Sequence, residues 1–265
     1  MFSLAGHSAL ITGSTKGVGL AIARSLAQAG ADVVLNCRQD SEQAQQALEI
    51  CRAEGVKAEL VTADLSGDTS VCVQQLYNTA LEANPGIDLL VNNAGTYIDK
   101  PFLDMDLETF DYTMRLNVYA SYFLTQAFAR HWVENEVAGR VLLIGSINGQ
   151  LAEQVHTAYD TSKGAVAMMV KSLCVSLAPL NIRVNGLAPG LVYTPLTAPA
   201  LDDPEFMKWM QLHTPSQQVP GPEVCGEGAV YLLSDEALHV HGQMLMVDGG
   251  MSSWQQPDPP DVASS

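Results

Sequence analysis

Short apolar segments and longer helical segments alternate along this chain. Seven segments are typical of buried strands: Ser8–Thr12, Asp32–Asn36, Ala58–Thr62, Leu89–Asn92, Arg140–Ile144, Ile182–Leu187 and Gln243–Val247. The stretches between them have helical periodicity, among them Ser41–Glu54, Thr69–Ala83, Leu107–His131 and Thr157–Leu177. Because consecutive parallel strands are joined by helical crossovers, this order predicts an α/β fold with a parallel sheet and helices on both faces.

The length and composition fit a single domain. A chain of 265 residues, 47% of them hydrophobic, can bury one large core. We predict one domain over residues 1–253. Residues 254–265 are polar, contain three prolines and have no periodicity, so we predict that this tail is disordered or lies on a neighbouring subunit.

Charge and cysteine usage argue against several classes of protein. The formal net charge of −16 disfavours nucleic acid as a partner, because phosphate binding needs a basic surface. No apolar stretch reaches the roughly 20 residues that span a bilayer, so no membrane partner is expected. Scattered cysteines without a Cys-x-x-Cys pair argue against a disulfide framework or a metal site and favour a reducing, cytoplasmic compartment. They are Cys37, Cys51, Cys72, Cys174 and Cys225.

Candidate chemistry begins with Tyr159 and Lys163, which are four residues apart and share one helix face. A neighbouring ammonium favours the phenolate and lowers a phenol pKa that ordinarily lies near ~10. Ser146 ends an apolar run thirteen positions before Tyr159, and its hydroxyl suits a hydrogen bond to a substrate oxygen while the tyrosine moves the proton. By itself, a Tyr/Lys pair at this spacing also fits a solvated helix face.

A second candidate is the glycine-rich segment Leu10–Gly19. Its spacing is Thr-Gly-x-x-x-Gly-x-Gly, with a strand before it and a helical segment after it. Glycines let the backbone approach a pyrophosphate closely, and the helix N-terminus offers free N–H groups and a partial positive charge. A tight turn without a ligand would contain the same glycines. The second strand at Asp32–Asn36, at the distance expected of a dinucleotide fold, favours the ligand.

With further motifs in the same order, the chain resembles a single-domain member of the short-chain dehydrogenase/reductase family. The match runs from about Leu4 to Ser253 and comprises Thr12–Gly19, Asp64–Leu65, Asn92–Gly95, Asn117, Ser146, Tyr159 with Lys163, Pro189–Gly190 and Asp248–Gly250. The resemblance implies a Rossmann-type, doubly wound, seven-stranded parallel sheet in the order 3-2-1-4-5-6-7. It also implies a catalytic tetrad, made of Asn117, Ser146, Tyr159 and Lys163.

The resemblance further implies which residues hold the dinucleotide. Asp64 would receive the adenine amino group, Lys163 would fix the nicotinamide ribose, and Asn117 would hold a water that connects the lysine to solvent. For Asp64, capping of the following helix near Ser66 and Asp68 is an alternative role. The full implied set is Gly13, Ser14, Thr15, Lys16, Gly17, Val18, Gly19, Asn36, Arg38, Asp64, Leu65, Asn93, Ala94, Gly95, Tyr159, Lys163, Pro189, Gly190, Val192 and Thr194.

The end of the second strand predicts which dinucleotide is used. An acidic residue there would bind the ribose hydroxyls of NAD and repel a 2′-phosphate. This chain has Asn36 in that position, followed by Arg38, and it has Lys16 in the glycine loop. Two cations and no carboxylate favour NADP, with NAD as the second option. The opposing interpretation is that both cations only face solvent.

The resemblance implies an oxidoreductase that transfers a hydride between NADP(H), or NAD(H), and a carbonyl or secondary alcohol. The polar stretch after Ser146, with Asn148 and Gln154 as candidate substrate residues, favours a sugar, polyol or sugar acid, although a solvated loop would look the same. A 3-oxoacyl-carrier-protein reductase is the alternative, disfavoured by the acidity of the chain. A non-catalytic nucleotide-binding regulator is the third hypothesis, and the complete tetrad argues against it. We expect His156 to have no direct catalytic role.

Residues 191–220 follow the implied nicotinamide turn, and we expect them to form a substrate lid. In this lid Asp203 and Pro204 predict the start of a short helix. We expect the apolar side of that helix to pack on the domain rather than face a substrate; it carries Phe206, Met207, Trp209 and Met210.

Two predicted helices indicate self-association. Leu107–His131 and Thr157–Leu177 carry more apolar residues than one buried face needs, which predicts a partner beyond their own sheet. In the family these helices meet their symmetry mates, so we expect a homotetramer, or otherwise a homodimer. The edge strand Gln243–Val247 is a candidate second interface.

Overall fold

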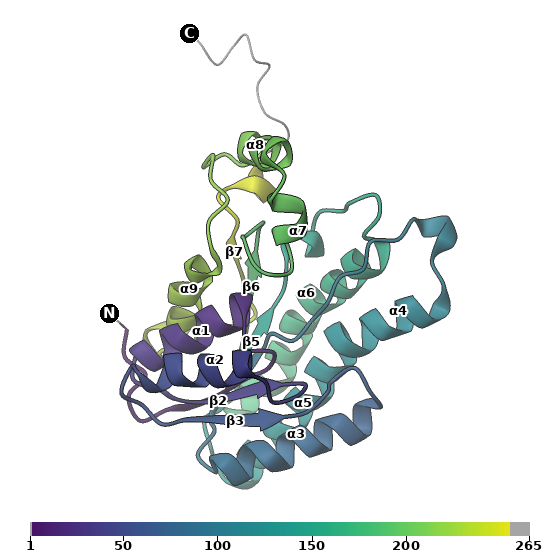
Figure 1. Cartoon of the computed structure of the whole chain (residues 1–265). Helices are drawn as coiled ribbons and strands as arrows, with labels where there is room; N and C mark the ends of the chain where they lie inside the picture. Colours follow the sequence, from purple (N-terminus) through teal and green to yellow (C-terminus); the bar gives the residue numbers. More distant parts are fainter. Residues whose placement is uncertain (1, 255–265) are drawn as a thin grey trace.

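The computed structural model describes residues 2–254, so the predicted tail at 255–265 lies outside the described residues. Seven strands in this range form one parallel sheet in the order β3-β2-β1-β4-β5-β6-β7, as predicted (Figure 1). They are β1 (Ser8–Ile11), β2 (Asp32–Cys37), β3 (Ala58–Thr62), β4 (Leu89–Asn92), β5 (Arg140–Ile144), β6 (Arg183–Pro189) and β7 (Met244–Val247).

Helices connect the strands and cover the sheet. The α-helices of residues 2–254 are α1 (Gly17–Gln28), α2 (Glu42–Arg52), α3 (Thr69–Ala83), α4 (Leu107–Met114), α5 (Ala120–Glu134), α6 (Thr157–Leu177), α7 (Ala198–Leu201), α8 (Pro204–Leu212) and α9 (Gly226–Leu233). Short turns complete them: a π-helical turn η2 (Arg115–Tyr119) and the 3₁₀ turns η1 (Phe102–Asp104), η3 (Ile147–Gly149), η4 (Ala178–Leu180), η5 (Pro222–Cys225), η6 (Asp235–Ala237) and η7 (Met251–Ser253).

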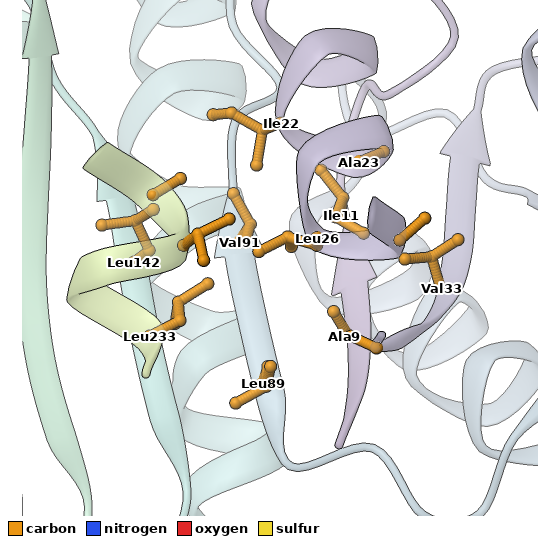
Figure 2. Close-up of a cluster of buried hydrophobic side chains, with 14 of the residues drawn as sticks. Ala9, Ile11, Ile22, Ala23, Leu26, Val33, Leu89, Val91, Leu142 and Leu233 are labelled. Carbon is orange, nitrogen blue, oxygen red and sulfur yellow. The ribbon is translucent and has the colours of Figure 1, made fainter. Parts of the chain in front are cut away.

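Two buried clusters lie on opposite faces of the sheet. One cluster lies under α1, α2 and α9, and Figure 2 shows Ile22 and Leu26 of α1 packed over Ile11 and Val91 of the central strands. The other lies under α3, α5 and α6, where Phe128 and Trp132 are among the largest buried side chains. Because both faces of the central strands are covered, their sequences are continuous apolar runs rather than alternating ones.

The segment predicted as one helix over Leu107–His131 is instead interrupted. Helix α4 ends at Met114, the π turn η2 follows, and α5 begins at Ala120. A π turn inserts an extra residue into a helix and is frequent at functional sites. Asn117 lies in this turn and is 2% exposed. Its position in the site therefore depends on a local distortion that the apolar pattern does not reveal.

The lid segment rises above the carboxyl ends of β6 and β7, with α7 and α8 at the top of Figure 1. The Asp203 side chain accepts a hydrogen bond from the Glu205 N–H at 2.9 Å, which confirms the predicted helix start. The expected packing of Phe206 and Trp209 on the domain is wrong, because these side chains are 38% and 52% exposed. Trp209 instead stacks on His213 of the lid itself, with ring centroids 3.8 Å apart.

Helix α6 with the turn after it, Thr157–Leu180, is long and apolar enough to cross a membrane by length and composition alone. Core helices of soluble proteins pass the same test. In this fold the segment packs against β5, β6 and η3 and carries Tyr159 and Lys163. Only 22% of its apolar window is buried within the chain, which leaves a large apolar surface to be explained.

Candidate active site

The predicted site residues gather at one edge of the sheet, where the carboxyl ends of β1, β4, β5 and β6 meet. In open α/β sheets ligands bind at this edge. The loops after β1 and β4 are joined directly: the Asn93 amide donates to the carbonyls of Thr12, at 2.9 Å, and Gly13, at 3.0 Å. The backbone N–H groups of Asn93 and Ala94 both donate to the Thr12 hydroxyl at 2.9 Å. The glycine loop is therefore fixed against the loop that ends in Gly95.

Helix α1 presents an uncapped N-terminus to this edge. Its N-cap residue is Lys16, whose backbone is extended, and no side chain caps the first turn and no acidic residue lies in it. The φ angle of Gly17 is +55°, a left-handed conformation that favours glycine. Across the loop lies Thr194 of the lid segment, 3.5 Å from where a Cβ of Gly17 would be. Free N–H groups at a helix N-terminus suit a phosphate.

Ser14 and Asn36 are buried supports of the loop. The Ser14 hydroxyl donates to the Ile11 carbonyl at 2.8 Å and accepts from the Asn36 N–H at 3.0 Å. Asn36 Oδ1 accepts from the Gly13 N–H at 3.3 Å, and the residue is 2% exposed. These contacts place both residues behind the loop rather than at its surface, while Thr15 and Val18 are half-buried.

Arg38 and Asp64 lie beside each other after β2 and β3. The last residues of these strands pair in register, Cys37 with Thr62, and Arg38 is exposed directly beyond them. Partial burial opposes ionisation of Asp64, but hydrogen bonds from the N–H and hydroxyl of Ser66 lower its pKa, with a smaller contribution from Arg38. The cap of α3 is Asp68 and not Asp64, so the structure does not support the alternative capping role of Asp64, and Leu65 is buried.

Tyr159 and Lys163 lie together at the start of α6. Lys163 Nζ is 5.6 Å from the centroid of the Tyr159 ring and donates to the Ile144 carbonyl at 2.9 Å. Burial lowers the pKa of Lys163 to about 8. Burial raises the pKa of Tyr159 to about 12, against the opposing effect of the Ser146 hydroxyl. The expected lowering of the phenol pKa by the lysine is therefore not seen, because desolvation of the phenolate dominates.

Asn117 is held by three hydrogen bonds. Its amide nitrogen donates to the Thr96 carbonyl at 2.8 Å and to the Ser162 hydroxyl at 2.9 Å, and its Oδ1 accepts from the Thr96 N–H at 2.8 Å. The π turn is thus tied both to the loop after β4 and to α6, one residue before Lys163. The predicted tetrad is brought together by β5, η2 and α6.

The turn after β6 closes the other half of the edge. The Gly190 N–H donates to the Val247 carbonyl at 2.9 Å, and a Cβ at this position would lie 2.7 Å from Asp248 Cα. Pro189 pairs with Val247 at the end of the sheet. Val192 and Thr194 are both buried, and the Thr194 N–H donates to the Thr197 hydroxyl at 2.9 Å.

The two candidate substrate residues differ in their environment. Asn148 is 7% exposed, and its amide donates to Asp160 at 2.8 Å and to Glu153 at 3.2 Å. Its two donor hydrogens are thus engaged within the protein. Gln154 is exposed. A substrate role for either residue stays a prediction.

Two residues at the site lie outside every motif. Tyr97 and His156 pack against Tyr159, with ring centroids 6.0 and 6.1 Å from that of the tyrosine. Tyr97 follows the Asn92–Gly95 motif by two positions. This closeness to the motif is the feature of the sequence that could have identified Tyr97 as a site residue.

Comparison with known proteins agrees with this geometry. The family described as enoyl-(acyl carrier protein) reductase matches residues 13–252. The 5-keto-D-gluconate 5-reductase of Escherichia coli is 36% identical over 95% of this chain and 97% of that protein. Glucose 1-dehydrogenase 2 of Bacillus subtilis is 35% identical over 94% and 96%. Among solved structures, this chain is similar to a gluconate 5-dehydrogenase from Burkholderia cenocepacia in complex with NADP and tartrate. The two sequences are 35% identical, the match covers 96% of this chain and 98% of that chain, and the TM-score is 0.85.

The chain belongs to the short-chain dehydrogenase/reductase family. It is an oxidoreductase that acts on CH–OH groups, as the resemblance implied.

Proposed function

We propose that this oxidoreductase transfers a hydride between NADP(H) and a carbon that alternates between carbonyl and secondary alcohol in a sugar, polyol or sugar acid. The observation that carries the chemistry is the placement of Tyr159 and Lys163 beside Ser146, at the edge where the glycine loop lies. The sugar-type substrate is supported by the relatives named above, which are 5-keto-D-gluconate, glucose and gluconate enzymes.

In the proposed reaction Ser146 and Tyr159 hydrogen-bond the reacting oxygen. Tyr159 accepts the hydroxyl proton during oxidation of the alcohol and returns it during reduction of the carbonyl. Lys163, charged below its pKa of about 8, stabilises the phenolate that forms. Asn117 holds the π turn against α6 through its hydrogen bond to Ser162. The nicotinamide supplies the hydride or accepts it when bound, while the protein supplies geometry and charge.

The residues present fit a dinucleotide at this edge. The uncapped N-terminus of α1 offers N–H donors to a pyrophosphate, and Thr194 faces it from the lid. Arg38 is exposed and makes no ion pair within residues 2–254, and it lies next to Asp64, where a 2′-phosphate and adenine would be held. The solved relative from Burkholderia cenocepacia contains NADP. These features support NADP over NAD.

A substrate panel tests the proposal. Purified protein is assayed with NADPH and NADH against 5-keto-D-gluconate and other keto sugars, and with the oxidised cofactors against D-gluconate, D-glucose and sugar alcohols. Conversion of at least one polyhydroxylated substrate, absent in Tyr159→Phe, is the expected result. Turnover of a 3-oxoacyl carrier protein alone would favour the carrier-protein reductase. Dinucleotide binding without turnover of any carbonyl would favour the regulator.

We also propose a homotetramer, with a homodimer as the alternative. A groove of about 390 Å³ lies between α5 and α6, lined by apolar residues such as Val133, Leu173 and Leu177. Nearby on α6, Met168 and Val175 are 60% and 76% exposed. Apolar exposure on this scale supports burial against a second copy.

The cysteines of residues 2–254 are all free, which supports a reducing compartment such as the cytoplasm.

A further inference from the structure

Three rings meet at the reacting phenol. Tyr97, His156 and Tyr159 lie roughly edge to face, with centroids 5.4 to 6.1 Å apart. Tyr97 comes from the loop after β4, and His156 lies just before α6. The ring of Tyr159 therefore packs against two side chains from different loops. Aromatic pairs prefer such edge-to-face arrangements, so this packing favours one orientation of the Tyr159 ring.

His156 joins these two loops. Its Nε2 lies 2.7 Å from Asp99 Oδ1, and its Nδ1 lies 3.3 Å from Glu153 Oε1. The Lys100 N–H donates to the Val155 carbonyl at 2.9 Å and adds a backbone link between the same loops. Glu153, and then Asp99, raise the pKa of His156 to about 9 against the effect of burial. His156 is therefore protonated at neutral pH, and each of its ring nitrogens faces a carboxylate. An imidazolium held in this way is unsuited to direct acid–base chemistry.

Tyr97 connects the same cluster to the lid. Its hydroxyl donates to the Leu196 carbonyl at 3.2 Å. Burial, followed by the charges of Asp99 and Glu153, raises the pKa of Tyr97, so its hydroxyl stays a donor. Leu196 lies two residues after Thr194, which faces the glycine loop. A continuous series of contacts thus runs from the lid through Tyr97 to the Tyr159 ring.

We propose that Tyr97 and His156 are positioning residues for the reaction. The Asp99–His156–Glu153 bridge holds the Tyr97 loop against α6, and Tyr97 transmits the position of the lid to Tyr159. A lid that moves over a substrate then aligns the phenol with the reacting oxygen. This inference rests on the proposed role of Tyr159, and it assigns no proton transfer to His156.

The first experiment compares Tyr97→Phe with the matched control Tyr77→Phe. Tyr77 also contacts a histidine, His131, with its hydroxyl 3.4 Å from the ring nitrogen, but Tyr77 is in α3 and faces α5, away from the site. Tyr97→Phe removes the link to the lid, so it should raise substrate KM about 3- to 10-fold, the effect of one lost hydrogen bond, and lower kcat as well, because the phenol is less well aligned. Hydrogen–deuterium exchange should rise at residues 194–201. Tyr77→Phe should change none of these quantities.

The second experiment compares His156→Gln with His131→Gln. His156→Gln should lower kcat about 10- to 100-fold, as expected for a slightly misplaced catalytic group, while NADPH affinity stays the same. Asp99→Asn should also lower kcat. The double variant should have a kcat no lower than that of His156→Gln alone, because both changes break the same bridge.

The results separate this inference from the proposed function. Activity retained in Tyr159→Phe would overturn the proposed function and the inference with it. An inactive Tyr159→Phe combined with wild-type kcat and KM in both Tyr97→Phe and His156→Gln would overturn the inference alone. A folded His156→Gln that loses NADPH affinity as much as kcat would also overturn it, because the bridge would then serve the cofactor pocket.

Discussion

The Asn93 amide nitrogen occupies the space that a Cβ atom on Gly19 would need. That amide fixes the loops after β1 and β4 to each other through the carbonyls of Thr12 and Gly13. The third glycine of the motif therefore serves loop-to-loop packing as much as ligand approach.

Gly19→Ala should accordingly displace Asn93 and widen the glycine loop. Overpacking of this kind costs about 1–3 kcal/mol, which corresponds to roughly 5- to 150-fold weaker NADPH binding if the loop bears the strain. Isothermal titration measures the affinity. Gly86→Ala, at the opposite end of β4, is the control. Equal affinities for both variants would show that the Gly19 contact is not needed for binding.

Tyr159→Phe should reduce kcat by at least ~10³-fold while NADPH affinity is nearly kept, because only the transferable proton is lost. Stopped-flow hydride transfer and dinucleotide titration on the same preparation separate the two quantities. Near-normal turnover would remove Tyr159 from the reaction.

Lys163→Met should be inactive but more stable than wild type in the absence of ligand. Burial depresses the lysine pKa from 10.5 to about 8, so at neutral pH the folded state carries a charge whose burial costs roughly 3 kcal/mol. The lost hydrogen bond to Ile144 offsets about 1 kcal/mol.

Lys163 also determines how the stability of the folded state changes with pH. The folded state binds fewer protons than the unfolded state between pH 8 and 10.5, so this group makes the wild type more stable as pH rises through that window. Thermal unfolding at several pH values should show the advantage of Lys163→Met shrinking there. A variant less stable than wild type at pH 7 contradicts this account.

Arg38→Asp should shift preference from NADP toward NAD, since the change removes a phosphate partner and adds repulsion. The ratio of kcat/KM for the two cofactors is the measurement. Lys57→Asp, which alters net charge equally at the opposite end of β3, should leave that ratio unchanged. Wild type with a much higher kcat/KM for NAD would refute the interpretation of Arg38.

Substitution of both Met168 and Val175 by Glu should weaken assembly, because two charges would be buried at the proposed contact between copies. Light scattering of wild type should give a multiple of the 28.4 kDa chain mass, and the variant a smaller particle. A stable, fully active wild-type monomer would exclude both the tetramer and the dimer.

Much of the fold follows from local pattern, because each strand is an apolar run bounded by turn residues. Strands β3, β4 and β5 and helices α3 and α6 have the predicted bounds. The π turn at Arg115–Tyr119 was missed because one inserted residue leaves helical periodicity nearly intact. The exposure of Trp209 and the bridge at His156 were missed for another reason: each depends on which distant segments meet, and no local spacing encodes that.

The bare N-terminus of α1 has a consequence for the life of the protein in a cell. An anion can accept hydrogen bonds from the free N–H groups of a helix that begins without a side-chain cap. A dinucleotide bound there would therefore stabilise the folded state. At a free concentration of about 100 times Kd, such a ligand adds roughly 2.7 kcal/mol of stability. Resistance to heat and proteases would then rise with the concentration of free dinucleotide.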